Sequence, residues 1–123
     1  MAWSAGAATG LATLFVVPSA ALAAFSDCRA DVYCLWTDKN GEGAGIWANT
    51  SLPDLRVQNM NDKVSSVANN STTKGLCLYV DLDFTGQVVE FVWPATHVNL
   101  DEPLINDLVT SVQWASRPDP TGC

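Results

Sequence analysis

One short pattern occurs twice in this chain, and the duplication constrains the fold more than any other feature. Both copies begin with a cysteine, continue through an aromatic residue and an aspartate, and end at a glycine. These residues are Cys34, Trp36, Asp38 and Gly43 in the first copy and Cys77, Tyr79, Asp81 and Gly86 in the second. The glycine supplies the positive φ that a strand needs where it folds over its own hairpin. We therefore expect two copies of one β unit.

The rest of the chain has the pattern of short strands separated by turn residues. The expected strands cover residues 32–36, 44–47, 64–67, 76–81, 88–93 and 109–114. Residues 69–75 are expected to be a polar linker, residues 94–103 a loop, and residues 52–55 a helical turn. No ten-residue window shows a 3.6-residue apolar period with caps. The sequence predicts an all-β sandwich of two Greek keys, at about residues 28–69 and 76–123.

The beginning of the chain has the features of a secretory signal. Leu11 to Val17 is a short apolar run, Pro18 breaks it, and Ala21-Leu22-Ala23 is a small-x-small cleavage site. No Lys or Arg precedes the run, which leaves a start further upstream open. We expect residues 1–23 to be a signal peptide. Residues 24–123 would then form one extracellular domain, a monomer that has no membrane attachment after the signal is removed.

The charges and cysteines limit the partners of this domain. The net charge of −7 repels phosphate backbones, which excludes nucleic acid and favours binding of a cation. Four cysteines in an exported chain predict two disulfides with three possible pairings. We favour Cys28–Cys34, which closes a short loop, and Cys77–Cys123, which ties the C-terminal end to the sheet. A cysteine metal site is a weaker alternative, because the chain has no Cys-x-x-Cys and His97 is far from any cysteine in sequence.

Two six-residue segments share a pattern of oxygen-bearing side chains. The first hexad is Asn61-Asp62-Lys63-Val64-Ser65-Ser66, and the second hexad is Asn106-Asp107-Leu108-Val109-Thr110-Ser111. A carboxylate or amide of the first pair, a main-chain carbonyl and the hydroxyl at the fifth position can converge on one ion. Calcium takes roughly six to eight oxygen ligands. The hexads therefore predict calcium at one or both positions.

These motifs resemble those of a known family. Tyr79, Phe84 and Gly86 have the spacing of the Greek-key signature of the βγ-crystallins, and the hexads resemble the calcium-binding pattern of microbial βγ-crystallins. The resemblance implies a βγ-crystallin-like sandwich and places Tyr79 against Phe84 across the folded hairpin. In the first half, Gly41 stands where the signature has an aromatic residue, so we expect a looser hairpin there.

The resemblance also implies how each ion would be completed. Each site would take ligands from the opposite half's folded hairpin, which makes Glu42-Gly43 and Thr85-Gly86 the second contributors. The Lys63 ammonium would lower the affinity of the first site, whereas Leu108 at the same position makes the second site tighter. The alternative is that Asn-Asp is ordinary turn chemistry and that the final serines cap backbone groups of the hairpins. The sequence leaves both roles open.

A second resemblance concerns function. The chain from Cys28 onward, with Cys34-Leu35-Trp36, is similar to a bacterial family of secreted metalloproteinase inhibitors that shares this fold, which implies a secreted peptidase as partner. A loop that blocks a peptidase must be exposed, extended and supported at its base. The candidates are the connections from Asn49 to Met60 and from Trp93 to Pro103. The alternative function is a calcium-stabilised extracellular module without a peptidase target.

Other functions have little support in the sequence. His97 lies near Asp101 and Glu102, but no nucleophile stands in a recognisable context, so we expect no enzymatic activity. The tryptophans at strand positions are expected to pack against the sheets rather than stack on carbohydrate. They are Trp36, Trp47, Trp93 and Trp114.

Overall fold

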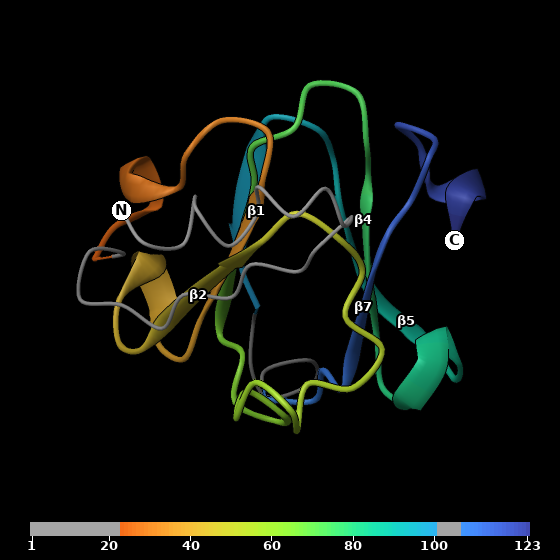
Figure 1. Cartoon of the computed structure of the whole chain (residues 1–123), viewed down its shortest axis with the longest axis horizontal. Coiled ribbons are helices and arrows are strands. Elements are labelled where there is room, and N and C mark those ends of the chain that lie inside the picture. Colours follow the sequence, from red (N-terminus) through yellow and green to blue (C-terminus); the bar gives the residue numbers. More distant parts are fainter. Residues whose placement is uncertain (1–22, 101–106) are drawn as a thin grey trace, which may run out of the picture.

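The computed structural model describes residues 23–100 and 107–123, which form two small β-sheets packed face to face (Figure 1). Residues 1–22 of the expected signal peptide lie outside this part. The strands are β1 (Tyr33–Trp36), β2 (Gly45–Ala48), β3 (Ser66–Asn69), β4 (Leu76–Tyr79), β5 (Val88–Val92), β6 (Thr96–Asn99) and β7 (Ser111–Trp114). Short 3₁₀ helices lie between or beside them: η1 (Phe25–Asp27), η2 (Lys39–Gly41), η3 (Leu82–Phe84) and η4 (Pro120–Gly122). No helix among the described residues is long and apolar enough to span a membrane.

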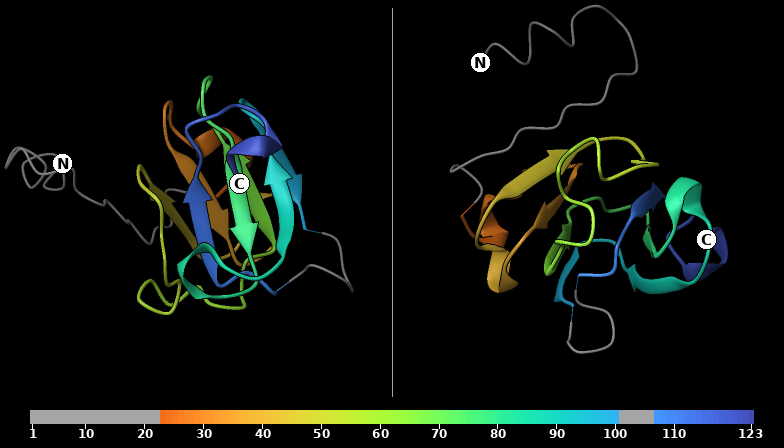
Figure 2. Two further views of the ribbon diagram at one scale, coloured as in Figure 1. Left: turned by 90° about the vertical axis from the view of Figure 1, so that its right-hand side faces the viewer. Right: turned by 90° about the horizontal axis from the view of Figure 1, so that it is seen from below.

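Each half of the chain contributes one segment to the sheet that is formed mainly by the other half. One sheet has the order β2-β1-β3-β6 and the other the order β5-β4-β7, and all neighbours are antiparallel (Figure 2). Strand β6 comes from the second half but pairs with β3 of the first half. In return, Leu52 of the first half forms a β-bridge with Val112 of β7. The predicted all-β sandwich of two Greek keys is confirmed.

Three local predictions were wrong. Residues 94–103 were expected to be a loop, but β6 forms there, because its pairing with β3 supplies the hydrogen bonds that the short polar segment could not supply alone. The third strand lies at Ser66–Asn69 instead of residues 64–67, because the carbonyl of Val64 accepts from the Asp107 N–H of the second hexad. The turn expected at residues 52–55 is displaced, since Leu52 pairs with β7 and the hydrogen-bonded turns follow at residues 55–59.

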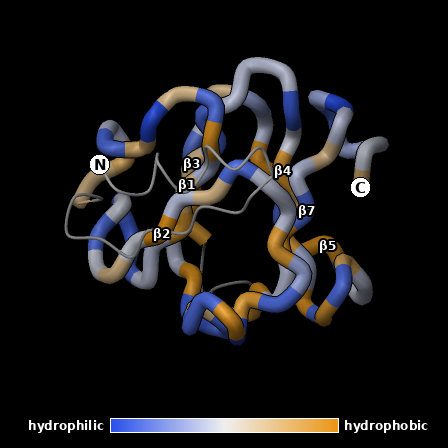
Figure 3. The backbone as a smooth tube through the Cα atoms, in the orientation of Figure 1, coloured by the Kyte–Doolittle hydropathy of each residue, from blue (hydrophilic) through white to orange (hydrophobic). Residues whose placement is uncertain are grey.

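The space between the sheets is filled by the inward side chains of both halves. Tyr33 and Leu35 of β1 and Leu76 and Leu78 of β4 point into this core and have no exposed surface. The hydrophobic stretches of the backbone accordingly follow the strands (Figure 3). Residues two apart on a strand share a face, so the alternation in the sequence placed these side chains correctly.

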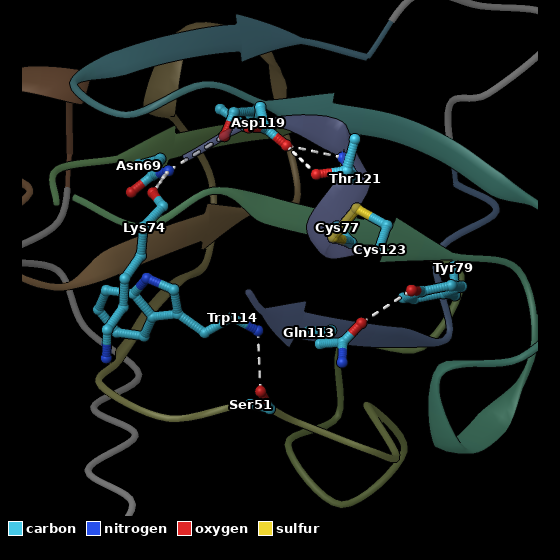
Figure 4. The surroundings of a disulfide bond; sticks show 11 residues. Ser51, Asn69, Lys74, Cys77, Tyr79, Gln113, Trp114, Asp119, Thr121 and Cys123 are labelled. Carbon is cyan, nitrogen blue, oxygen red and sulfur yellow. Dashed lines mark hydrogen bonds between the residues drawn. A yellow bond between two sulfur atoms is a disulfide. The ribbon is translucent and has the colours of Figure 1, made fainter. Parts of the chain in front are cut away.

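The outer faces of both sheets are also covered, which the sequence did not predict. The alternation of residues 76–81 is that of a half-buried strand, yet all residues of β4, and of β1 as well, are buried. The N-terminal strap, residues 23–32, lies over β1 and is tied by the disulfide Cys28–Cys34. The C-terminal strap, residues 115–123, lies over β4 and is tied by Cys77–Cys123 (Figure 4). The favoured disulfide pairing is confirmed.

Candidate functional site at the paired hexads

The two folded hairpins have the same backbone conformation. Asn40 and Asp83 have φ values of 61° and 57°, and Gly43 and Gly86 have φ values of 79° and 77°. A Cβ at Gly86 would collide with the Asp81 carboxylate, so the glycine is required there. The duplicated pattern of the sequence therefore corresponds to a duplicated backbone geometry.

The last serine of each hexad fastens its own half's hairpin. Ser66 Oγ donates to the carbonyl of Asp38 at 2.6 Å and accepts from the Gly41 N–H at 3.0 Å. Ser111 Oγ donates to the carbonyl of Asp81 at 2.5 Å and accepts from the Phe84 N–H at 3.0 Å. Both serines are fully buried. They have the structural role that the alternative interpretation of the hexads gave them.

The hexads contact each other through reciprocal backbone hydrogen bonds. The Asp62 N–H donates to the carbonyl of Val109 at 3.1 Å, and the Asp107 N–H donates to the carbonyl of Val64 at 3.2 Å. Both aspartates have positive φ, 55° and 61°. Aspartate tolerates this conformation better than most residues, so the Asn-Asp pair is the local reason for the shared turn.

Side chains of both hexads also meet at this contact. The hydroxyl of Ser65, which is 6% exposed, donates to Asp107 Oδ1 at 3.2 Å. The Oδ1 atom of Asn61, on the first hexad, is buried without a hydrogen-bond partner in the described structure. A carboxylate, a hydroxyl and an unpartnered amide oxygen are oxygen ligands of the kind that calcium accepts.

The remaining predicted ligands are more dispersed. Asp62, Lys63, Glu42 and Thr85 are exposed, and Asn106 lies outside the described residues. The Lys63 ammonium donates to Asn59 Oδ1 at 3.0 Å, away from the hexad oxygens. Leu108 is 40% exposed and Thr110 is half-buried.

The described contacts do not join the predicted hairpin ligands to the hexad of the opposite half. The Thr85 hydroxyl donates to the carbonyl of Leu82 at 2.6 Å within its own hairpin. Each hairpin is fastened to its own half's hexad through the final serine. Among residues 23–100 and 107–123, no three His, Cys, Asp or Glu side chains form a metal-holding group.

In the second hairpin, Tyr79 and Phe84 contact each other as the signature implies. The Tyr79 and Phe84 rings lie 6.2 Å apart at a tilt of 58°. Phe84 adopts φ 60°, a conformation that costs a non-glycine residue about 1 kcal/mol or more. Contact with Tyr79 offsets this cost.

Phe25 supplies the aromatic residue that the first hairpin lacks. Gly41, the counterpart of Phe84, is buried, and the backbone of Ala24 and Phe25 fills the space where a side chain would begin. The Phe25 ring lies edge-on to Trp36 at 5.5 Å and stacks on His97 at 4.1 Å. The Phe25 ring thus takes the place of the missing aromatic side chain. The sequence did not predict this, because Phe25 adjoins the signal-like segment. The sequence did contain a signal for this role. Phe25 lies shortly before Cys28, in the half of the chain that has glycine, Gly41, where the signature has an aromatic residue.

The connection at residues 49–60 forms a compact projection, which we call the 53–59 tip. Its base is fixed by Leu52, whose N–H and carbonyl both bond to Val112 at 2.8 and 2.9 Å, and by the buried Leu55 and Met60. Hydrogen-bonded turns hold the tip, and Val57 is 76% exposed. The tip is exposed and supported but coiled, so the expectation of an extended loop was wrong for it.

A bidentate ion pair braces the tip. The guanidinium of Arg56 donates two hydrogen bonds to the Asp54 carboxylate, both at 2.9 Å, and these bonds lower the pKa of Asp54 below its usual value. The Arg56 side chain is 61% exposed. The ion pair is exposed, so it favours this conformation of the tip only modestly.

Comparison with solved structures identifies the fold. A domain from work on the evolution of the eye-lens βγ-crystallin fold superimposes with a TM-score of 0.65 at 24% identity, over 85% of this chain and 98% of that chain. The chain has the βγ-crystallin fold. A βγ-crystallin from Ciona intestinalis matches at TM-score 0.57 and 24% identity, over 68% and 98% of the two chains. Spherulin 3a from Physarum polycephalum matches at TM-score 0.54 and 22% identity, over 87% and 98%.

A family model connects part of the chain with inhibitors. Residues 21–75 match the model of peptidase inhibitor family I36. This segment contains the N-terminal strap, β1 to β3 and the 53–59 tip, and it ends before Trp93. No curated protein matches the chain. The chain thus has the βγ-crystallin fold, and the sequence of its first half resembles the inhibitor family.

Proposed function

We propose that this protein is an extracellular, non-enzymatic inhibitor of a secreted peptidase and that it blocks the peptidase with the 53–59 tip. The observation that carries the proposal is the match of residues 21–75 to the inhibitor family, because this segment contains the tip. Both disulfides are consistent with an oxidising compartment.

The tip is better suited to this role than the connection after Trp93. The latter is a short turn followed by β6, whose edge pairs with β3, and its residues 101–103 lie outside the described part. The tip instead projects a large apolar side chain, Val57, from a base that is buried and paired with β7. A preordered tip loses little conformational entropy on binding. Because the tip is coiled and not extended, it would obstruct the cleft rather than lie along it as a substrate does, and its turns oppose the extended conformation that cleavage would require.

A peptidase panel tests the proposal. The protein at micromolar concentration is assayed against secreted metallo- and serine peptidases, alone and as Val57→Asp. We expect inhibition that weakens about tenfold or more in Val57→Asp, because a charge would be desolvated in the cleft. Val88→Asp is the matched control, since Val88 is an exposed valine on β5. Absence of inhibition across the panel, or equal losses in the two variants, would reject the tip.

Calcium binding at the hexads is a second candidate function, favoured by the contact between Ser65 and Asp107. The residues present fit a calcium ion in their chemistry: Asp107, Ser65 and Asn61 offer carboxylate, hydroxyl and amide oxygens. They would hold the ion across the two halves, and the ion would supply a charge-neutralising link in an acidic domain. Few carboxylates at the site predict weak binding, about 10⁻⁴ to 10⁻³ M as in extracellular modules.

Thermal unfolding in calcium and in chelator tests this second function. At a free calcium concentration ten times the dissociation constant, linkage adds about 1.4 kcal/mol, or about 6–11 °C in melting temperature for a domain of this size. Asp107→Asn should remove most of this gain. Asp31→Asn is the control, because Asp31 also has positive φ but lies outside the hexads. Identical melting temperatures with calcium and chelator would end the proposal.

A further inference from the structure

The two disulfides tie equivalent straps but differ in their exposure to solvent. Cys28 is 5% exposed, and its partner Cys34 is fully buried. Cys77 is also fully buried, whereas Cys123, its partner in Figure 4, is exposed. Reduction of a disulfide begins with the attack of a thiolate on an accessible sulfur atom. A reductant therefore has access to one end of the second disulfide, whereas both ends of the first are buried.

The N-terminal strap has several links to the sheet besides its disulfide. The Asp31 N–H donates to the carbonyl of Asn70 at 2.9 Å, and the Asn70 N–H donates to the carbonyl of Val32 at 2.9 Å. The Asn70 side chain donates to the carbonyl of Cys28 at 2.7 Å. These hydrogen bonds hold Cys28 beside Cys34 independently of the covalent bond.

The far end of the C-terminal strap depends on its disulfide. The Arg117 carbonyl accepts from the Gly75 N–H at 2.9 Å, which fixes the strap up to that residue. Residues 118–123, which we call the strap end, follow this bond. Within the described part of the chain, every hydrogen bond of the strap end stays inside the segment itself. Most of its residues are exposed, and Cys77–Cys123 is its covalent link to β4.

The strap end lies outside the main core of the sandwich. Cys77 belongs to a small cluster on the outer face of the second sheet, with Tyr79 and Ala115 buried beside it and Phe84 and Phe91 packed against them. The larger cluster between the two sheets contains no residue of the strap end. Detachment of the strap end would therefore uncover the surroundings of Cys77 and leave the core between the sheets complete.

We propose that Cys77–Cys123 is a redox-sensitive clasp: a dithiol reductant opens it before Cys28–Cys34, and the strap end then detaches while the sandwich stays folded. A thiolate of the reductant attacks the Cys123 sulfur, and the Cys77 sulfur leaves as a thiolate that takes up a proton. The second thiol of the reductant then releases Cys123 and closes the reductant's own disulfide, so that two electrons pass to the protein. Cys123 moves away with the strap end, whereas Cys28 stays beside Cys34 and re-forms its bond. The clasp does not depend on the tip or on the hexads.

Differential alkylation of the full, disulfide-bonded chain tests the proposal. The protein is exposed to graded concentrations of dithiothreitol under native conditions, free thiols are trapped with iodoacetamide, and peptide masses identify the alkylated cysteines. We expect Cys77 and Cys123 to be trapped at a reductant concentration about tenfold or more below that needed for Cys28 and Cys34. Tryptophan fluorescence of the same samples should remain that of the folded protein. Amide hydrogen exchange should accelerate in the strap end but not in β1.

Paired serine variants separate the clasp from a general loss of stability. Cys77→Ser with Cys123→Ser should stay folded, with the faster amide exchange confined to the strap end. Cys28→Ser with Cys34→Ser is the matched control and should keep the N-terminal strap protected, because the hydrogen bonds of that strap remain. Simultaneous or reversed reduction of the two disulfides, or resistance of both until the protein unfolds, would overturn the proposal. A strap end that stays protected in the first variant would overturn it as well, since other contacts would then hold the segment.

Discussion

Replacing Phe25 by alanine tests whether the N-terminal strap completes the first Greek key. A fully buried phenylalanine loses about 3–5 kcal/mol of stability when it becomes alanine. Phe25 is only partly buried, so we expect about half of that loss from burial. Its ring contacts with Trp36 and His97 each add about 0.5–1.5 kcal/mol beyond burial. The expected destabilisation is about 2.5–5.5 kcal/mol, or about 10–40 °C in melting temperature.

The second hairpin provides matched controls. Phe84→Ala removes a partly buried ring and the one ring contact described there, with Tyr79, and should cost about 2–4 kcal/mol. Phe84→Gly copies the residue found at Gly41 and relieves the positive φ, so it should cost about 1 kcal/mol less than Phe84→Ala. Urea unfolding with both disulfides intact, followed by tryptophan fluorescence, gives all three values. A loss below about 0.5 kcal/mol for Phe25→Ala would refute the assignment of Phe25 as the missing corner residue.

Three further outcomes are expected. Ser66→Ala should cost about 1–3 kcal/mol in urea unfolding, because the carbonyl of Asp38 and the N–H of Gly41 lose a buried partner; an unchanged midpoint would show that the serine does not fasten the hairpin. Burial raises the pKa of the Tyr33 phenol well above 10.0, so its stabilising effect on the fold is fully present below about pH 10 and falls as the pH rises further. The urea midpoint of Tyr33→Phe should therefore decline less between about pH 9 and pH 11 than that of the unmodified protein. Lys63→Leu, which copies the second hexad, should raise calcium affinity at the first site; calorimetry that gives equal affinities before and after the change would contradict this charge effect.

The duplication made much of the fold predictable from sequence. One cysteine, one aspartate and one glycine recur at equal spacing in the two copies, so the two hairpins could be inferred from the sequence, whereas the disulfide pairing was favoured on loop closure. Cys34 and Cys77 occupy corresponding positions on β1 and β4, and each receives a cysteine from the strap nearest to it. Repetition of this kind is a strong signal because both copies must satisfy the same backbone geometry.

The errors have a common physical origin in contacts between distant segments. β6 is a polar edge strand next to Pro94, and only its pairing with β3 makes it a strand. The outer face of β4 is buried by the C-terminal strap, which lies far from it in sequence, so alternation predicted one buried face there where there are two. Phe25 is adjacent to Gly41 in space only because the strap folds back. Local patterns do not contain this information.

The arrangement of the candidate calcium ligands was predictable only in part. The reciprocal bonds of Asp62 and Asp107 follow from the repeated Asn-Asp pattern, and the meeting of Ser65 with Asp107 joins two residues that the pattern had singled out. The pattern did not specify which carboxylate would approach which hydroxyl, because that depends on how the halves oppose each other. The hairpin residues Glu42 and Thr85 stay on their own side in the described contacts, so their role as ligands remains a prediction.

Comparison of the two halves separates what holds the fold from what is available for binding. Both halves share three structural features: a serine that hydrogen-bonds to its hairpin, a glycine with positive φ, and a disulfide to a strap. The exchanged segments differ: the second half contributes β6, whereas the first contributes one bridge at Leu52 and extends the remaining residues into the 53–59 tip. The residues opposite the disulfide cysteines differ as well, since Trp47 pairs with Cys34 whereas Phe91 pairs with Cys77. A duplicated domain is stabilised by its shared features, so its unmatched features are free to serve partners, and the 53–59 tip is such a feature.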